Sequence, residues 1–339
     1  MPRIIIGDDV FAYDGRSYER GPLGGTETAT VKLAEALAAH GNRVVVETLT
    51  PEPVEHNGVL WRPAGSVREN ADLVIVSRRP GNLARYRHIR RRAVWLHGPG
   101  QYLRKPRHAW PLFRQPASCV CIGTYQAGTV PGWIPFRGRY VFPYGISADF
   151  LDPPSLSVAP PPHVLFTSNF QRSLDWVLDL WERRIHPAVP AAELHIYGGP
   201  AVYGGQMAEK MRAPMEQAQR MAGLGVRLMG PLAKDQLAGR LRAGRLMAYR
   251  GDLGETYCLS AAEAVACGLP VVTAGIGSLK ERVEDGRTGF IREDADGFAG
   301  ACIQILTDDT LWRRLHENCR TFPQRLWRDA AADFESLIG

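Results

Sequence analysis

Short apolar runs and amphipathic segments alternate along the first half of the chain. An apolar run at residues 4–6 predicts a strand, and a loop rich in glycine and aspartate follows it as far as Gly25. From Thr26 the apolar positions recur every three or four residues, which predicts a helix that Gly41 ends as its C-cap. A β-branched run at residues 44–48 predicts the next strand, and strands linked by helices are typical of a parallel sheet. Further apolar runs lie at residues 73–76, 93–96 and 120–122.

The same alternation restarts in the second half of the chain. Strands are predicted at residues 163–167, 193–197, 226–229, 245–249 and 270–273. Helices are predicted at residues 175–184, 208–221, 234–243, 257–267 and 298–307. The pattern therefore predicts an α/β protein in which two domains, each built of alternating strands and helices, follow one another along the chain.

A proline-rich segment separates the two halves. Residues 149–162 contain five prolines, and proline removes a backbone donor that a helix or an interior strand needs. We therefore predict a linker at 149–162, an N-terminal domain at 1–148 and a C-terminal domain at 163–322. The remaining residues, 323–339, predict a last amphipathic helix.

The composition is that of an ordinary globular protein. Of the 339 residues, 45% are apolar and 22% are charged, which excludes intrinsic disorder and collagen-like structure. The most apolar stretch is too short to cross a bilayer, and the first residues do not have the pattern of a signal peptide. The six cysteines lack the spacing of a zinc site or a disulfide framework, so we expect reduced thiols and a cytoplasmic protein.

The charge is unevenly distributed. Residues 1–150 carry 20 Lys and Arg against 12 Asp and Glu, a net charge of +8, whereas residues 151–339 carry 21 against 23. Seven arginines lie between residues 78 and 92 without an acidic residue among them. A solvated helix face accounts for several of these arginines. A phosphorylated acceptor or an anionic membrane surface, contacted peripherally at the inner face, is an equally good explanation of the excess.

The segment from Gly254 to Gly289 carries the clearest candidate chemistry. Glu255 and Glu263 lie eight residues apart and flank the start of a predicted helix. The free amides of residues 257–259 point out of that helix, where the helix dipole favours an anion such as a diphosphate. Glu263 lies about 9 Å further along the helix, at roughly 1.5 Å per residue, where it is placed to accept hydrogen bonds from a ribose diol. One helix is thus suited to bind a nucleotide diphosphate-sugar.

This segment resembles the retaining GT-B glycosyltransferases of family 4 (group 1). The features in common are the two glutamates, the sequence EAVACGLPVV that begins at Glu263, and the sequence DGRTGF that begins at Asp285. Looser matches are Gly24-Gly25-Thr26-Glu27, His97 after an apolar run, and Ile196-Tyr197-Gly198-Gly199. The resemblance extends over nearly the whole chain.

The resemblance implies an architecture and an activity. The implied fold is GT-B, in which two Rossmann-like domains face each other across a cleft and the C-terminal helix returns to the N-terminal domain. The N-terminal domain would bind a hydroxyl acceptor and the C-terminal domain a nucleotide-sugar. The implied reaction is transfer of a hexosyl group with retention, without metal or other cofactor, and neither the sugar nor the base (UDP, GDP or ADP) follows from the sequence. In the family a diphosphate oxygen accepts the acceptor's proton, whereas spacing alone equally allows Glu255 to act as a covalent nucleophile.

The resemblance also assigns roles to residues. The catalytic positions are Glu255, which binds hydroxyls of the donor sugar, His97, which contacts the same sugar, and Arg172. The donor-binding positions are Gly24, Gly25, Asn169, Gly199, Gly230, Leu232, Thr256, Tyr257, Cys258, Leu259 and Glu263. No metal ligand is expected, since no DxD-like triad is evident and the helix amides with one cation would stabilise the departing diphosphate.

One position departs from the family pattern. Family members carry an arginine after the first strand of the second domain and a lysine a few residues later. Here Asn169 occupies the place of the arginine, and Arg172 lies near that of the lysine. Arg172 is therefore the candidate phosphate cation. Thr256 and Cys258 stand where the family commonly has glycines, and a low-pKa nucleophilic role for Cys258 finds no support in its neighbours.

Three other functions compete with transfer. A catalytically weakened GT-B protein that only binds a nucleotide would fit the departure at Asn169. An NAD-dependent oxidoreductase would have a similar fold, but no G-x-G-x-x-G follows the first strand of either domain. A nucleic-acid binder would fit the basic first half, but no motif of interleaved aromatic and basic residues supports it, so no nucleic-acid partner is expected.

Overall fold

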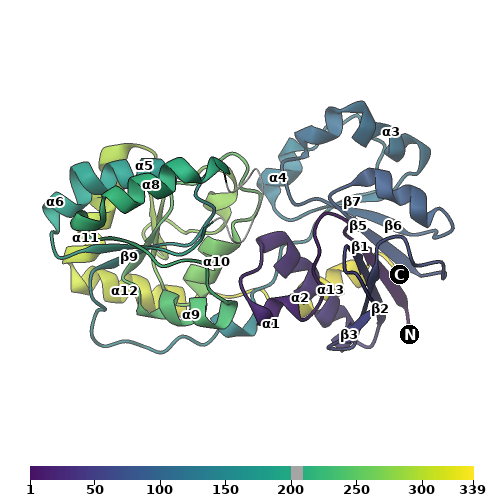
Figure 1. Ribbon diagram of the computed structural model, residues 1–339, viewed down its shortest axis with the longest axis horizontal. Helices are drawn as coiled ribbons and strands as arrows, with labels where there is room; N and C mark the ends of the chain where they lie inside the picture. The colour runs from purple at the N-terminus through teal and green to yellow at the C-terminus, as the bar shows by residue number, and fades with distance from the viewer. Residues whose placement is uncertain (200–208) are drawn as a thin grey trace. The chain divides into compact units, whose positions relative to one another are not determined.

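The computed structural model describes residues 1–199 and 209–339, which form two compact units (Figure 1). The first unit consists of Met1–Ser147 and Arg325–Gly339, and the second of Ala148–Gln324. The predicted linker, residues 149–162, groups with the second unit. Phe150 is fully buried, and Arg242 Nη2 donates to the carbonyl oxygens of Asp149 and Leu151 at 2.6 and 2.9 Å. Side chains of the second unit thus fix the start of this segment in place.

The first unit contains an eight-stranded sheet in the order β3-β4-β2-β1-β5-β6-β7-β8. Its strands are β1 (Arg3–Gly7), β2 (Arg43–Thr48), β3 (Val54–His56), β4 (Val59–Pro63), β5 (Leu73–Ser77), β6 (Arg92–Trp95), β7 (Ser118–Cys121) and β8 (Arg139–Val141). All neighbours are parallel except β3 and β4. Its helices are α1 (Ser17–Arg20), α2 (Gly25–Ala39), α3 (Pro106–Arg114), α4 (Thr124–Thr129) and α13 (Trp327–Glu335), with 3-10 turns at Pro80–Tyr86 and Gly100–Arg104.

The last helix, α13, belongs to the first unit and packs against α2, as the adjoining yellow and purple ribbons of Figure 1 show. Phe334 on α13 inserts among aromatic rings, with its centroid 5.3 Å from those of both Trp95 and Phe142. A Cβ at Gly145 would lie 2.2 Å from the backbone nitrogen of Trp327, so this approach requires a glycine. The helix therefore docks through a close-packed contact.

The second unit contains a parallel sheet in the order β11-β10-β9-β12-β13-β14 among the described residues. Its strands are β9 (His163–Phe166), β10 (Glu193–Ile196), β11 (Val226–Leu228), β12 (Leu246–Ala248), β13 (Val271–Thr273) and β14 (Gly289–Ile291). Its helices include α5 (Leu174–Leu180), continued by a π-helical turn at Trp181–Ile185, α6 (His186–Ala188), α8 (Arg212–Arg220), α9 (Lys234–Ala243), α10 (Leu259–Ala266), α11 (Ala295–Thr307) and α12 (Asp309–Arg320).

Most predicted elements are present, with shifted ends and some omissions. The predicted helix 257–267 begins at Leu259, because Cys258 takes a left-handed conformation with φ 64° as its N-cap. The predicted helix 208–221 is observed as α8, and residue 208 lies outside the described residues. The pattern missed α12, although Asp308 caps it by accepting hydrogen bonds from two amides. The strands that the pattern missed are β3, β4, β8 and β14, three to five residues each.

Both sheets contain a switch point, where the chain reverses the direction in which strands are added. In the first unit β2 lies on one side of β1 and β5 on the other. In the second unit β10 lies on one side of β9 and β12 on the other. Ligands of open α/β sheets bind beyond the carboxyl ends of the two strands at such a point. The loops after β1 and β5, and after β9 and β12, are therefore where each unit would bind a ligand.

Candidate functional site

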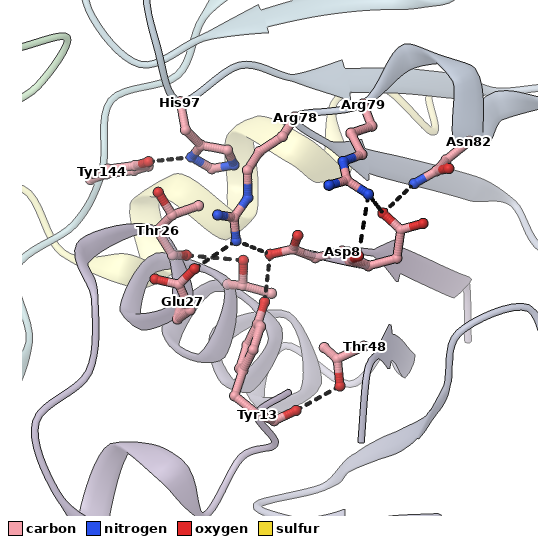
Figure 2. A network of polar contacts seen from close by, with 12 residues as sticks. Asp8, Tyr13, Thr26, Glu27, Thr48, Arg78, Arg79, Asn82, His97 and Tyr144 are labelled. Carbon is pink, nitrogen blue, oxygen red and sulfur yellow. Dashed lines mark hydrogen bonds and ion pairs between the residues drawn. The ribbon is translucent and has the colours of Figure 1, made fainter. Parts of the chain in front are cut away.

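The switch point of the first unit carries a network of charged side chains (Figure 2). Asp8 directly follows β1, and Arg78 directly follows β5. Arg78 Nη2 lies 2.5 Å from Asp8 Oδ2 and 2.7 Å from Oε1 of Glu27, which comes from the first turn of α2. Tyr13 Oη donates a further hydrogen bond of 2.7 Å to Asp8 Oδ2. The network thus ties together two strand ends, a helix and the loop between them.

Burial sets the electrostatics of this network. Asp8 is fully buried and Glu27 is 8% exposed. Burial of Arg78 disfavours its charged form, but Asp8 and then Glu27 outweigh this and raise the pKa of the guanidinium above its ordinary value. Two carboxylates surround one arginine. The charge of Arg78 is therefore already balanced within the protein.

His97 lies beside this network, two residues after the end of β6. Its Nδ1 shares a hydrogen bond with the hydroxyl of Tyr144, as Figure 2 shows. Burial, and then the charge of Arg78, holds the pKa of His97 well below its ordinary value. The imidazole is therefore neutral at pH 7, with one nitrogen that donates and one that accepts. A cavity of about 350 Å³ adjoins it and is lined by Thr26, Arg78, His97, Gly98, Tyr102 and His108.

The two glycines predicted to contact the donor stand at the start of α2. Gly24 is its N-cap and Gly25 its first residue. A Cβ at Gly24 would lie 2.3 Å from Glu27 Oε2. Since Arg78 holds the Glu27 carboxylate, a side chain at Gly24 would disturb the whole network. Gly24 is thus needed for the arrangement of the site itself.

The switch point of the second unit carries an ion pair between the two loops that follow its central strands. Arg172 lies in the loop after β9 and Glu255 in the loop after β12, and Arg172 Nη1 contacts Glu255 Oε1. The hydroxyl of Tyr249, the residue after β12, donates to the same oxygen. Ser173 Oγ donates to the carbonyl oxygen of Gly251 at 3.0 Å and so links the loops a second time. Glu255 is only 6% exposed, whereas the side chain of Arg172 is 34% exposed, so the carboxylate is the buried member of the pair.

The environment keeps Arg172 charged. Burial disfavours the guanidinium, but the carboxylate of Glu255 outweighs it and raises the pKa of Arg172 above its ordinary value. The pKa of the Tyr249 hydroxyl is raised by burial and by neighbouring groups, so this side chain stays a donor at neutral pH. The site therefore combines a permanent cation with a carboxylate that the cation and a phenol hold in place.

Glu263 forms a second ion pair in the same unit. It lies on α10, is 3% exposed, and accepts a hydrogen bond of 2.6 Å from Lys234 Nζ at the start of α9. Burial raises the pKa of Glu263 above its ordinary value, and Lys234 opposes that shift. Lys234 was not predicted. Lys234 lies in the first turn of α9, 29 residues from Glu263 along the chain, and no sequence motif links the two residues.

The start of α10 is built as an enclosed helix terminus. Thr256, Tyr257 and Cys258 are all buried, and the guanidinium carbon of Arg282 lies 4.2 Å from the ring centroid of Tyr257. Leu259 is the first helical residue. Burial, and then Glu255, raises the pKa of the Cys258 thiol well above its ordinary value, so it stays protonated. Cys258 therefore serves as the N-cap residue of α10 and not as a nucleophile.

The remaining predicted donor residues lie in loops that follow other strands of the second unit. Asn169 Oδ1 accepts a hydrogen bond of 2.9 Å from the amide of Gln171 and shapes the turn that leads to Arg172. Gly199 and Gly230 follow β10 and β11 with φ angles of 146° and 75°, and the amide of Gly198 donates to the carbonyl oxygen of Gly230. Leu232 is half-buried.

The structure groups the predicted residues by unit. In the second unit it joins Arg172 to Glu255, and Glu263 lies on the helix that follows. In the first unit it places Gly24 and His97 at one network. The residues that sequence reasoning missed or did not assign to a site are Asp8, Glu27, Arg78, Tyr144, Lys234 and Tyr249. A signal was present for Asp8, Arg78 and Tyr249, because each directly follows a buried strand.

Comparison with known proteins identifies the class of the second unit. Residues 161–308 match the family model of the group 1 glycosyl transferases. The chain is 34% identical over 120 residues to D-inositol 3-phosphate glycosyltransferase of Geodermatophilus obscurus, covering 34% of this chain and 25% of that protein. It is 34% identical over 89 residues to N-acetyl-alpha-D-glucosaminyl L-malate synthase of Bacillus anthracis, covering 26% and 23%. The chain therefore spans about a quarter of the length of these relatives.

Solved structures resemble the whole chain. Sucrose-phosphate synthase of Thermosynechococcus elongatus matches with a TM-score of 0.78 at 18% identity, covering 99% of this chain and 98% of that one. Anabaena HepE, solved in complex with UDP-glucose, matches with a TM-score of 0.72 at 15% identity and 99% coverage of both chains. The predicted GT-B fold is thereby confirmed. The sequence likeness to the group 1 glycosyl transferases lies in residues 161–308, within the second unit.

Proposed function

We propose that the protein transfers a sugar from a nucleotide diphosphate-sugar to a hydroxyl acceptor with retention. The observation that carries this proposal is the Arg172–Glu255 pair. It occupies the switch point of the unit that matches the group 1 family, and it combines a phosphate-binding cation with a group able to bind sugar hydroxyls. That solved neighbours such as HepE bind UDP-glucose supports a nucleotide-sugar as donor.

The second unit would bind the donor through three groups. The amides at the start of α10 and the guanidinium of Arg172 would hold the diphosphate, because both provide positive potential. Glu263 would accept hydrogen bonds from the ribose, while Lys234 holds the carboxylate in place and opposes the rise in its pKa that burial causes. Glu255 would bind hydroxyls of the sugar while Arg172 and Tyr249 fix its position.

Arg172 supports a metal-independent departure of the diphosphate. Its charge is permanent, and negative charge grows on the leaving group as the glycosidic bond breaks. The pairing of Glu255 with a cation lowers the nucleophilicity of its carboxylate. This favours attack by the acceptor on the face from which the diphosphate leaves, with a phosphate oxygen accepting the proton, over a covalent intermediate on Glu255. The same pair favours transfer over a weakened binding protein, since it provides a cation despite Asn169.

The first unit would bind the acceptor at its cavity of about 350 Å³. Arg78 is neutralised by Asp8 and Glu27, so this cavity favours a ligand that is rich in hydroxyls over one that relies on Arg78 as a phosphate partner. The neutral imidazole of His97 can exchange hydrogen bonds with hydroxyl groups of the transferred sugar or the acceptor.

A thermal-shift screen with UDP, GDP and ADP tests the donor proposal. A nucleotide at a hundred times its dissociation constant stabilises the folded state by about 2.7 kcal/mol, so one of the three should raise the melting temperature measurably. The matching nucleoside monophosphate, which lacks the second phosphate, should shift it less. Mass spectrometry of the corresponding nucleotide-sugar should then reveal transfer or slow hydrolysis. Identical melting curves with all three diphosphates at millimolar concentration would refute the proposal.

We also propose that a basic segment of the first unit contacts an anionic membrane surface. Residues 73–148 carry 13 Lys and Arg and no acidic residue. Within the cluster at 78–92, Arg78, Arg79 and Arg85 form ion pairs with Asp8 or Asp9, which favours a contact through other residues of this segment. Among the helices of the described residues, none is long and apolar enough to cross a bilayer.

Helix α3 provides a surface of the right chemistry. Ala109 and Leu112 are buried, whereas Trp110 and Phe113 are exposed, at 60% and 51%. Trp133, 55% exposed, stacks on Phe113 with ring centroids 6.2 Å apart. The neighbouring cations are Arg104, Lys105, Arg107 and Arg114. Exposed aromatic rings flanked by cations are typical of segments that lie in the interface of an anionic bilayer.

We expect the chain to sediment with vesicles that contain phosphatidylglycerol and not with vesicles of phosphatidylcholine alone. Combined Trp110→Ala and Phe113→Ala substitutions should weaken that binding roughly tenfold or more, since each ring would bury apolar area in the bilayer. The matched control is Leu253→Ala, which removes a 70% exposed apolar side chain from the second unit. Binding that is equal for both lipid compositions, or unaffected by the double substitution, would rule the surface out.

A further inference from the structure

Two adjacent strands of the second unit present two histidines and a glutamate on one face of the sheet. His163 is the first residue of β9, and the parallel register places it beside Glu193 at the start of β10. His195 follows Glu193 by two residues, and alternate residues of a strand point to the same face. The register alone therefore brings three metal-ligating side chains together.

The distances between the three groups are short. His195 Nε2 lies 2.8 Å from Glu193 Oε2, and His163 Nε2 lies 3.8 Å from the same oxygen. The two imidazole rings have centroids 4.4 Å apart. Candidate ligand atoms from all three side chains lie within 4.8 Å of one another. One small ion placed among these atoms would reach them at about 2.0–2.2 Å, as zinc does, after modest side-chain rotations.

We propose that His163, Glu193 and His195 bind one divalent transition-metal ion of the Zn²⁺ type. Two imidazoles and one carboxylate form a set that zinc uses with a water molecule as fourth ligand. The side chains of His163 and Glu193 are 32% and 33% exposed, so solvent and ions can reach the group. The site goes beyond the proposed function and does not depend on it.

The surroundings prepare the three side chains for this role. Arg227 Nη2 lies 3.0 Å from Glu193 Oε1 and leaves Oε2 directed at the histidines. Outer partners of this kind orient ligating carboxylates in metal sites.

The position of the group indicates a structural or regulatory ion. His163 and Glu193 begin their strands, whereas Arg172 follows the carboxyl end of β9, so the ion would not contact the switch-point pair. An ion here would cross-link β9 to β10. Because β9 leads directly into the loop that carries Arg172, bound metal would restrain the framework of that loop.

Calorimetric titration of the full chain, without a histidine tag, with Zn²⁺ alone tests the proposal. We expect one site per chain, and cobalt(II) bound at that site should give the visible absorption of a low-coordinate ion. His195→Ala and Glu193→Gln should each weaken zinc binding by at least about tenfold, the size of effect seen even for outer-shell substitutions. Glu193→Gln retains the size of the side chain, so it tests the site even where His195→Ala is poorly folded.

The matched control is His186→Ala, which removes a half-buried histidine of the same unit that is not part of the group. It should bind zinc as the unchanged chain does. Failure to saturate at one ion per chain below about a hundred micromolar, or zinc affinity in His195→Ala and Glu193→Gln equal to that of the unchanged chain, would show that the three side chains form only a hydrogen-bonded cluster. Neither result would affect nucleotide binding, so the two proposals fail separately.

Discussion

Replacing Arg172 with alanine is expected to lower the turnover number about a hundredfold while it raises the donor Michaelis constant by much less. The guanidinium interacts most strongly with the diphosphate after negative charge has developed on it, so its loss affects the transition state more than the bound donor. Steady-state kinetics with the donor that the thermal-shift screen identifies would measure both constants.

Arg172→Lys separates charge from geometry. Removing Arg172 also leaves the buried Glu255 carboxylate without its cation, and breaking a buried pair is strongly destabilising. Arg172→Lys keeps the charge and should recover part of the turnover, whereas a site that needs a bidentate guanidinium would not recover. The matched control, Arg184→Ala, removes an exposed arginine paired with the exposed Asp296. Turnover near that of the unchanged protein in Arg172→Ala would discard the role.

Replacing Glu263 with alanine is expected to weaken binding of the free nucleoside diphosphate more than replacing Glu255 does. The ribose belongs to donor and free nucleotide alike, whereas the sugar that Glu255 would contact belongs only to the donor. Losing a hydrogen bond to a charged group costs roughly 1.5 to 3 kcal/mol, which corresponds to a loss of affinity of about 10- to 150-fold. Calorimetry with the free diphosphate measures this for both variants.

Lys234 provides the control for that comparison. It holds Glu263 at 2.6 Å, and Glu263→Ala leaves its ammonium group unpaired in a largely buried place. Lys234→Met removes the cation but keeps the carboxylate, so it should weaken nucleotide binding by less than Glu263→Ala. Equal losses of affinity in Glu263→Ala and Glu255→Ala would contradict the assignment of the ribose to Glu263.

The order of elements was predictable from the sequence because it depends on local patterns. Apolar runs of three to five residues correspond to the central strands of both sheets, and the apolar period of residues 26–41 predicted the α2 helix. The strands β3 and β8 were missed because neither contains a buried residue, and each depends on pairing with a neighbour. The segment 149–162 was read as a linker from its prolines, yet side-chain hydrogen bonds from distant residues hold its start in the second unit.

The sequence by itself determined that this is a two-part α/β protein with a family 4-like donor segment, since the glutamates and glycines of that segment are neighbours along the chain. Only the tertiary structure decided which groups meet. Arg172 and Glu255 are 83 residues apart, and Asp8 and Arg78 are 70 apart. Each pair forms because parallel pairing brings the carboxyl ends of two strands to one edge of a sheet. Strand order determines which loops meet in this way. It depends on long-range packing, and no local pattern of residues encodes it.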